Sequence, residues 1–165
     1  MIRVAIITIS DGVTAGARED KSGAALDARA SELGWKILEK RTIPDEKLTI
    51  SDTIATLANS GAVDLILSTG GTGVSPRDVT PEAVVAVADR QIPGFGEVMR
   101  SEGRKSTKFS PLSRGGGYTL GATLVVTLPG SPKGAVESLD AIADLIPHVV
   151  DLLHGRTEHA QQPSP

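Results

Sequence analysis

The chain has 165 residues, about the length of a single domain, and its 39% hydrophobic and 22% charged residues are ordinary for a globular protein. This composition excludes a disordered, collagen-like or membrane-spanning chain, and the absence of cysteine excludes disulfides, thiolate metal sites and cysteine nucleophiles. A net charge of -3 and an aromatic content of 2% provide no basic field and few stacking surfaces, so we expect no binding to nucleic acid or to membranes.

The chain opens with a pattern typical of a buried strand followed by a helix. Val4–Ile9 is a continuous, mostly β-branched run, as in strands of parallel sheets that are buried on both faces. The run is too short for the apolar region of a signal peptide, and we therefore expect a cytoplasmic protein. A polar loop, Ser10–Lys21, leads to a helix that Ser22 can cap and that Gly34 ends.

Two further strands are predicted on either side of a second helix. Lys36–Ile43 predicts a more exposed strand, whereas Val63–Ser68 is apolar and predicts a buried one. Gly61 breaks the chain after the intervening helix. The apolar residues that share one face of this helix are Ile50, Ile54, Leu57 and Ala58.

The second half of the chain predicts one more strong strand among helices and loops. We expect a helix over Thr80–Asp89, with Thr80 as its N-cap, and an amphipathic segment over Phe95–Arg104. Ser101–Gly117 is polar, ends in three glycines and predicts a loop. Thr123–Leu128 predicts the remaining strand.

Two helices complete the predicted domain, the second of them over about Leu145–Leu153. The first has three apolar residues at helical spacing, Val136, Leu139 and Ile142. Strands and helices in regular succession indicate an α/β fold with a mostly parallel central sheet and helices on both faces. We expect this domain to occupy residues 1–156 and residues 157–165 to form a flexible polar tail.

Ligands of open α/β sheets bind at the carboxyl ends of the strands. Three predicted loops qualify because each directly follows a strand, namely Ser10–Gly12, Thr69–Asp78 and Pro129–Gly134. We expect all three loops to lie at one edge of the sheet.

The loop after the third strand has the composition of an anion-binding turn. Gly70, Gly71 and Gly73 allow positive φ and bring N–H groups close to a ligand such as phosphate, and Thr69 and Thr72 add hydroxyls. A tight turn that only reverses the chain is the alternative, but three glycines with two threonines favour binding. The loop matches neither the dinucleotide-binding G-x-G-x-x-G motif nor a Walker A loop, which excludes a standard P-loop NTPase.

Two aspartates follow strands at the predicted edge. Asp78 lies next to the glycine turn, where a carboxylate beside a phosphate needs a cation such as Mg²⁺ to offset the repulsion, although capping of the next helix explains it equally well. By spacing alone, helix capping is the simpler interpretation of Asp45. If the second strand lies beside the third, both carboxylates lie at the same edge and could share one ion.

The other polar residues at this edge have structural interpretations as well as functional ones. Ser131 is expected to cap a helix with Pro132 in its first turn, and helix N-termini also bind anions. Arg114 could hold a phosphate with its planar guanidinium. Ser10 and Asp11 would stabilise their own loop. The histidines fit no metal-ligand or triad pattern and are expected to be exposed or to pack: His148, His154 and His159.

Several motifs in combination resemble the Mog/MoaB family of molybdenum-cofactor biosynthesis. The resemblance begins at Thr69–Gly73 and Arg77–Ala83 and covers nearly the whole chain up to the tail. Further matching segments are Ile43–Glu46, Ala88–Arg90, Pro93–Glu97, Leu112–Arg114 and Leu128–Pro132.

The resemblance implies a molybdopterin-binding α/β fold in a homotrimer, and an enzyme that transfers AMP from Mg-ATP to the molybdopterin phosphate with release of pyrophosphate. A separate protein would then receive the product and insert molybdate. The resemblance also implies that Asp45 and Asp78 act in nucleotide binding, metal binding and catalysis. With Ser10 and Asp11 from the same predicted edge, the expected substrate-binding residues are Thr69, Gly70, Gly71, Thr72, Gly73, Ser113, Arg114, Gly130, Ser131 and Pro132.

The main alternative is a non-catalytic molybdopterin-binding or carrier protein, because some MoaB-type members are thought to lack adenylyl transfer while keeping the fold. The presence of both Asp45 and Asp78 favours activity. A molybdate-insertion enzyme is normally a larger multidomain chain and does not fit 165 residues. A generic nucleotide-binding module is the last alternative.

Overall fold

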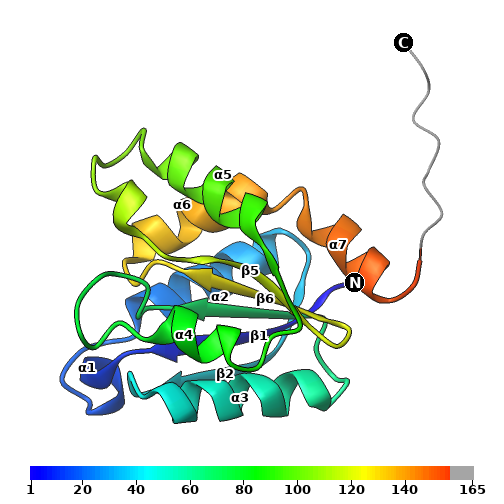
Figure 1. Cartoon of the computed structure of the whole chain (residues 1–165), viewed down its shortest axis with the longest axis horizontal. Coiled ribbons are helices and arrows are strands. Elements are labelled where there is room, and N and C mark those ends of the chain that lie inside the picture. Colours follow the sequence, from blue (N-terminus) through cyan, green and yellow to red (C-terminus); the bar gives the residue numbers. More distant parts are fainter. Residues whose placement is uncertain (157–165) are drawn as a thin grey trace.

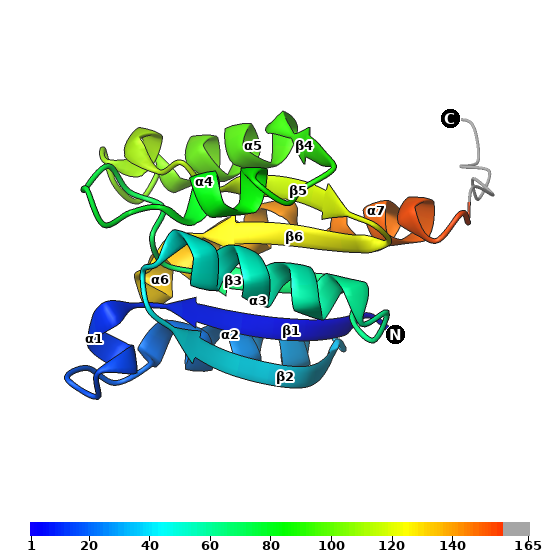
Figure 2. The same ribbon diagram turned by 60° about the horizontal axis from the view of Figure 1, so that its bottom comes forward.

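The computed structural model describes residues 1–156, so the expected tail 157–165, with His159, lies outside the described residues. The strands are β1 (Arg3–Ile9), β2 (Lys36–Ile43), β3 (Leu65–Thr69), β4 (Arg90–Ile92), β5 (Gly116–Leu120) and β6 (Thr123–Leu128). They form one sheet in the order β2-β1-β3-β6-β5-β4. β1, β2, β3 and β6 run parallel, while β5 is antiparallel to both of its neighbours (Figure 2).

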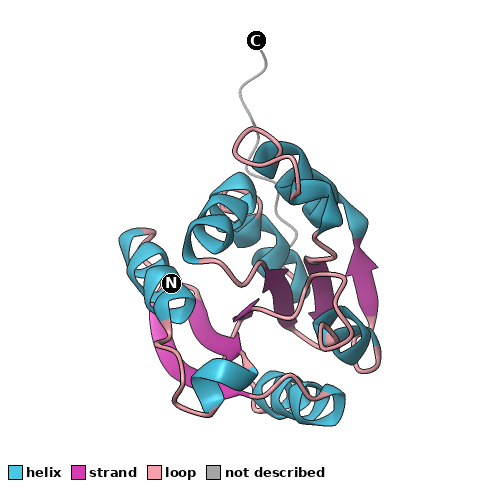
Figure 3. Ribbon diagram, turned by 90° about the vertical axis from the view of Figure 1, so that its left-hand side faces the viewer, coloured by secondary structure: helices cyan, strands magenta, loops and turns pink. Residues whose placement is uncertain are grey.

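Helices cover both faces of this sheet and produce three layers (Figures 1 and 3). The helices are α1 (Asp11–Thr14), α2 (Lys21–Glu32), α3 (Lys47–Asn59), α4 (Thr80–Val85), α5 (Pro93–Gly103), α6 (Pro132–Ile142) and α7 (Ile146–Leu153), with a 3-10 turn η1 (Ser110–Leu112). Buried residues of α2, α5, α6 and α7 form one core with the sheet, and those of α3 and α4 form the other. The predicted α/β architecture with a mostly parallel sheet is confirmed.

Side-chain alternation along the strands accounts for the two cores. Val4 and Ile6 of β1 belong to the core beneath α2 and α6, whereas Ala5 and Ile7 belong to the core beneath α3. None of the four is more than 1% exposed, as expected for a parallel strand covered on both faces.

The prediction of a loop over Ser101–Gly117 is wrong at its start, where α5 continues to Gly103, and at its end, where β5 begins at Gly116. The glycines there serve close packing, because a Cβ at Gly117 would lie 2.6 Å from the ring of Phe95 in α5. A Cβ at Gly115 would lie 2.5 Å from the carbonyl oxygen of Thr127 in β6. Glycine that signals a loop in the sequence therefore allows a helix and two strands to approach one another.

Two helix starts differ from the prediction. The N-cap of α2 is Asp20 rather than Ser22, and its carboxylate accepts a hydrogen bond from the amide of Gly23 at 2.8 Å. The residue before α4 is Val79, and Thr80 instead donates its hydroxyl hydrogen bond to the carbonyl oxygen of Gly70 at 2.9 Å. That bond attaches the start of α4 to the glycine turn.

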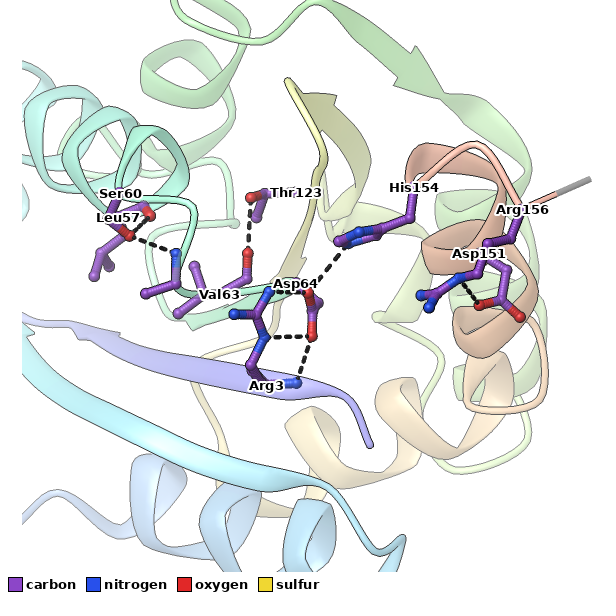
Figure 4. A network of polar contacts seen from close by, with 10 residues as sticks. Arg3, Leu57, Ser60, Val63, Asp64, Thr123, Asp151, His154 and Arg156 are labelled. Carbon is purple, nitrogen blue, oxygen red and sulfur yellow. Dashed lines mark hydrogen bonds and ion pairs between the residues drawn. The ribbon is translucent and has the colours of Figure 1, made fainter.

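A buried carboxylate joins three segments at the end of the sheet where β1 and β3 begin (Figure 4). Asp64 accepts hydrogen bonds from the backbone amide of Arg3 at 2.8 Å and from Nη2 of its guanidinium at 2.7 Å. Nε2 of His154, after α7, lies 3.1 Å from Oδ1 of the same carboxylate. The last described helix is thereby attached to the sheet.

No helix within residues 1–156 is long and apolar enough to cross a membrane.

Candidate active site

A cleft of about 520 Å³ lies at the edge of the sheet where β1, β2, β3 and β6 end. The three predicted loops meet there, as expected. β2 does not lie beside β3, because β1 lies between them, yet all three strands are parallel and end at the same edge. The predicted site residues that line the cleft are Ser10, Asp45, Thr69, Gly70, Gly71, Asp78, Gly130, Ser131 and Pro132.

The turn after β3 requires glycine for steric reasons. Gly70 and Gly71 have φ angles of 103° and 68°, in the region that disfavours other residues. A Cβ at Gly70 would lie 2.2 Å from the carbonyl oxygen of Ile9, and a Cβ at Gly130 would lie 3.3 Å from the Cα of Gly70. The glycines therefore let the loops after β1, β3 and β6 touch and place bare backbone in the cleft wall.

Asp45 is held by a reciprocal pair of hydrogen bonds with Asp11. The Asp11 amide donates to Oδ2 of Asp45 at 2.9 Å, and the Asp45 amide donates to Oδ1 of Asp11 at 3.0 Å. Burial raises the pKa of Asp45, and the charges of Asp11 and Asp78 raise it further against the lowering effect of the Asp11 hydrogen bond. The capping interpretation is wrong because the N-cap of α3 is Glu46.

Asp78 is held within its own loop and lines the same cleft. Its Oδ2 accepts a hydrogen bond from the amide of Ser75 at 2.9 Å. It does not cap α4, whose N-cap is Val79. Among the described residues, no donor reaches Oδ1 of Asp78 or Oδ1 of Asp45. Each aspartate therefore presents one unengaged carboxylate oxygen.

These two carboxylates fit a hard divalent cation that is shared with a ligand. Mg²⁺ is usually held by one or two carboxylates together with phosphate oxygens and water. The unengaged Oδ1 atoms of Asp45 and Asp78 provide two such carboxylates, and a cation would relieve the repulsion that raises the pKa of Asp45. Residues 1–156 contain no group of three or more acidic, histidine or cysteine side chains that could hold a metal. Cation binding here would thus depend on the phosphates of a substrate.

Arg114 supports the loop of Asp78 rather than the cleft itself. Its Nε donates to the carbonyl oxygen of Gly73 at 2.8 Å and its Nη2 to the carbonyl oxygen of Asp78 at 2.7 Å. Its Nη1 forms an ion pair with Glu82. The guanidinium is engaged on all three nitrogens by protein oxygens, and Arg114 does not line the cleft. Arg114 therefore binds the loop of Asp78 in this structure and not, as predicted, a phosphate.

The remaining predicted residues form walls and supports. Thr69 donates its hydroxyl hydrogen bond to the carbonyl oxygen of Pro129 at 2.6 Å, which ties two loops together. Ser131 is the N-cap of α6, as predicted, and accepts a hydrogen bond from the amide of Gly134 at 3.1 Å. The predicted residues that do not line the cleft are Asp11, Thr72, Gly73, Ser113 and Arg114.

A smaller pocket of about 180 Å³ adjoins the cleft at Ser131, which lines both. Its walls include the apolar side chains of Met99 and Phe109, and Ser113 lies here rather than in the cleft. The guanidinium of Arg100 also lines the pocket and donates to the carbonyl oxygen of Ser113 at 3.3 Å. The site therefore has a polar part and a more apolar part that meet at one residue.

The sequence prediction does not include the cleft residues that precede and begin α2. In the sequence, these residues are marked only by their position in or directly after a loop that follows a strand. The loop is so long that residue spacing does not show which of its residues lie at the cleft. These residues are Arg18, Glu19, Lys21 and Ser22.

Comparisons with known proteins agree with this architecture. The molybdopterin adenylyltransferase of Escherichia coli (strain K12) is 40% identical over 156 residues, which cover 93% of this chain and 79% of that protein. The molybdopterin adenylyltransferase of Haemophilus influenzae is 38% identical over 146 residues, 87% of this chain and 74% of that protein.

Solved structures match over the whole fold. The molybdopterin biosynthesis enzyme MoaB from Thermus thermophilus superposes with a TM-score of 0.88 at 41% identity, covering 94% of this chain and 98% of that one. The Mog protein from Mycobacterium ulcerans has a TM-score of 0.85 at 36% identity, covering 93% and 99%. The family model described as "Probable molybdopterin binding domain" matches residues 5–148. The chain belongs to this molybdopterin-binding family of molybdenum-cofactor biosynthesis.

Proposed function

We propose that this protein is a molybdopterin adenylyltransferase, which transfers AMP from Mg-ATP to the terminal phosphate of molybdopterin. The observation that carries the proposal is the junction of two unlike pockets at Ser131, one lined by Asp45 and Asp78 and the other partly apolar. The phosphates of the nucleotide would bind in the polar cleft and the flat pterin in the more apolar pocket, with the reacting groups of both near Ser131. The identity of 40% with a protein named for this activity supports the same conclusion.

The proposed step is a displacement at phosphorus. An oxygen of the molybdopterin phosphate attacks the α-phosphorus of ATP and forms a new P–O bond. The bond from the α-phosphorus to the oxygen that bridges it to the β-phosphate breaks, and its electron pair leaves with pyrophosphate. Because the attacking phosphate is already ionised near neutral pH, the step needs no general base. Catalysis then rests mainly on positioning and on charge stabilisation.

The residues of the cleft suit these two tasks. Asp45 and Asp78 would hold Mg²⁺, which when bound supplies positive charge against the transferring phosphate. Gly70 and Gly71 line the cleft and have no side chains of their own, so phosphate oxygens could approach their backbone closely. Ser131, at the N-terminus of α6, adds the positive end of a helix dipole between the two pockets.

The decisive experiment incubates the purified protein with molybdopterin and Mg-ATP. We expect stoichiometric formation of adenylylated molybdopterin and pyrophosphate, detected by chromatography and by a coupled pyrophosphate assay. A non-catalytic molybdopterin-binding or carrier protein is the second candidate, because a pocket with apolar walls can hold a pterin without chemistry. Pterin binding without pyrophosphate release would favour that candidate and contradict the transferase.

The same proposal includes the setting of the reaction. The resemblance to the Mog/MoaB family supports a homotrimer and delivery of the adenylylated product to a molybdate-insertion protein. We also propose a location in the cytoplasm, because the proposed reaction consumes ATP. Light scattering on the purified protein tests the trimer directly, since the mass of one chain is 17.1 kDa.

A further inference from the structure

Two cationic side chains line the cleft without a protein partner. Arg18 lies in the loop before α2, and Lys21 is the first residue of that helix. Within residues 1–156, neither side chain forms an ion pair or a hydrogen bond. By contrast, Arg77, from the loop after β3, is paired with Asp11 at 2.8 Å. Unpaired cations that face a shared cleft indicate a site for an anionic ligand.

The neighbouring carboxylates form no ion pair with either cation among the described residues. Asp20 lies between Arg18 and Lys21 in sequence, but its carboxylate accepts hydrogen bonds from the hydroxyl of Thr8 at 2.8 Å and from the amide of Gly23 at 2.8 Å. Glu19 lines the cleft and forms no ion pair among the described residues. Of the charged residues before and at the start of α2 that line the cleft, two are cations, Arg18 and Lys21, and one is an anion, Glu19.

Two further observations support a binding site at Arg18, Lys21 and Ser22. The aliphatic part of Arg18 packs over the backbone of Gly12, where an added Cβ would lie 2.8 Å from Cδ of the arginine. Ser22 is 7% exposed and lines the cleft, and its hydroxyl has no hydrogen-bond partner among the described residues. An accessible hydroxyl without a protein partner, next to two unpaired cations, suits the oxygen atoms of a phosphate chain.

We propose that Arg18, Lys21 and Ser22 bind the β- and γ-phosphates of the nucleotide and retain them as pyrophosphate when the α-phosphorus is transferred. The identity of the anion rests on the proposed function. The same cleft is lined by Asp45 and Asp78, which would hold Mg²⁺, so the ion could contact the phosphates that these three residues bind. Arginine and lysine would stabilise the charge that the leaving group gains.

The first test measures binding of inorganic pyrophosphate to the full chain by isothermal titration calorimetry in the presence of Mg²⁺. Arg18→Gln and Lys21→Gln should each weaken binding about tenfold, as expected for the loss of one charge-assisted contact. Glu19→Gln should strengthen binding, because it removes a negative charge from the same wall. The matched control is Lys36→Gln, an exposed lysine at the start of β2, away from the cleft, which should bind pyrophosphate as the wild type does.

A second measurement separates this site from the rest of the nucleotide site. AMP lacks the β- and γ-phosphates, so its affinity should be unchanged in Arg18→Gln and Lys21→Gln. In the transfer assay, both variants should raise KM for ATP about tenfold and leave KM for molybdopterin unchanged.

The inference and the proposed function can fail separately. If the wild type does not bind pyrophosphate, or if both variants bind it as tightly as the wild type, the inference is wrong even where AMP transfer is observed. An equal loss of AMP affinity would also overturn it, because the residues would then serve the fold or the adenylyl part. If the wild type transfers no AMP but loses pyrophosphate binding on mutation, the site stands and the proposed transferase falls.

Discussion

Asp11 and Asp45 exchange hydrogen bonds, with each carboxylate accepting the backbone amide of the other residue. Asp11 accepts three further hydrogen bonds from Arg77, one from Nε at 3.0 Å and two from Nη2 at 2.9 and 2.8 Å. These bonds and that of the Asp45 amide hold the pKa of Asp11 below its ordinary range. The ionised Asp11 carboxylate is thus a strong acceptor for the Asp45 amide, and this hydrogen bond holds Asp45 in place at the cleft. Arg77 precedes Asp78 directly in the chain and forms an ion pair with Asp11, which in turn bonds Asp45. Arg77 therefore links the loop of Asp78 to Asp45.

Asp11→Ala should lower turnover without lowering stability appreciably. The variant removes the acceptor that orients Asp45 and the partner of Arg77, and losses of such supporting contacts typically reduce activity about 10–100-fold. Asp11→Asn keeps an acceptor for the Asp45 amide but loses the charge pair, so its activity should lie between those of Asp11→Ala and the wild type. Steady-state pyrophosphate release and thermal unfolding measure the two effects. Equal activity in Asp11→Ala and wild type would contradict the supporting role.

Asp45→Asn should reduce turnover by about 100-fold or more and leave the fold at least as stable as in the wild type. The pKa of Asp45 is raised, so its ionised form is disfavoured in the folded state, and stability falls as the pH rises through the ordinary value and then the raised one. The variant removes this penalty. Its advantage in thermal unfolding should therefore appear at pH 7 and vanish below about pH 3.9.

Asp78→Asn should lose turnover to a similar extent, and the stabilising effect of Mg²⁺ with ATP on thermal unfolding should shrink in both variants. Retention of wild-type turnover by either variant would exclude that aspartate from metal binding and catalysis.

Arg114→Lys should release the loop that carries Asp78. Lysine cannot replace the planar guanidinium that contacts the carbonyl oxygens of Gly73 and Asp78 and the carboxylate of Glu82 at the same time. We expect faster hydrogen–deuterium exchange over residues 72–79 and lower kcat. If Arg114 bound substrate phosphate directly instead, the variant would raise KM for that substrate and leave exchange in the loop unchanged.

Asp64→Asn should destabilise the fold by about 1–3 kcal/mol at pH 7, because a buried carboxylate loses charge-assisted hydrogen bonds. Burial alone would raise the pKa of Asp64, but the side-chain and backbone hydrogen bonds of Arg3, its charge and that of His154 lower it overall. A lowered pKa means that the stabilisation is present above the ordinary aspartate value and is lost as the pH falls through the folded-state value.

Urea denaturation between pH 7 and pH 3 tests this dependence, and the gap between variant and wild type should narrow below about pH 4. A gap that is independent of pH would show that packing, not charge, explains the loss. Asp140→Asn is a suitable control, since its ion pair with Arg29 is largely exposed and should contribute little.

Local sequence patterns predict most of the sheet. The bounds of β2 and β6 agree with the predicted Lys36–Ile43 and Thr123–Leu128, because alternation and β-branched runs are properties of the segment itself. The prediction fails for β5, where the ring of Phe95, a residue more than twenty positions earlier in the chain, leaves no room for a Cβ at Gly117. No local pattern encodes that contact, and the glycines alone therefore predict a loop.

For the candidate site, the sequence predicts the location but not the role of each residue. The rule that ligands bind at the carboxyl ends of strands is sufficient to bring Asp45, Asp78 and the glycine turn into one cleft, although β1 separates β2 from β3. It is not sufficient to assign individual roles. The guanidinium of Arg114 donates hydrogen bonds to carbonyl oxygens, whereas Arg18 and Lys21 have no partner among the described residues. This difference depends on which loops lie next to one another in the folded chain.

Consecutive residues thus specify the α/β architecture, the family and the edge of the sheet that holds the site, because strand periodicity, glycine turns and family motifs are all local features. Which charged side chains the protein engages and which ones face the cleft is settled by the folded chain. Hydrogen bonds and ion pairs such as Asp11 with Asp45 and Asp64 with His154 join residues far apart in the sequence, and their geometry exists only after the sheet has formed.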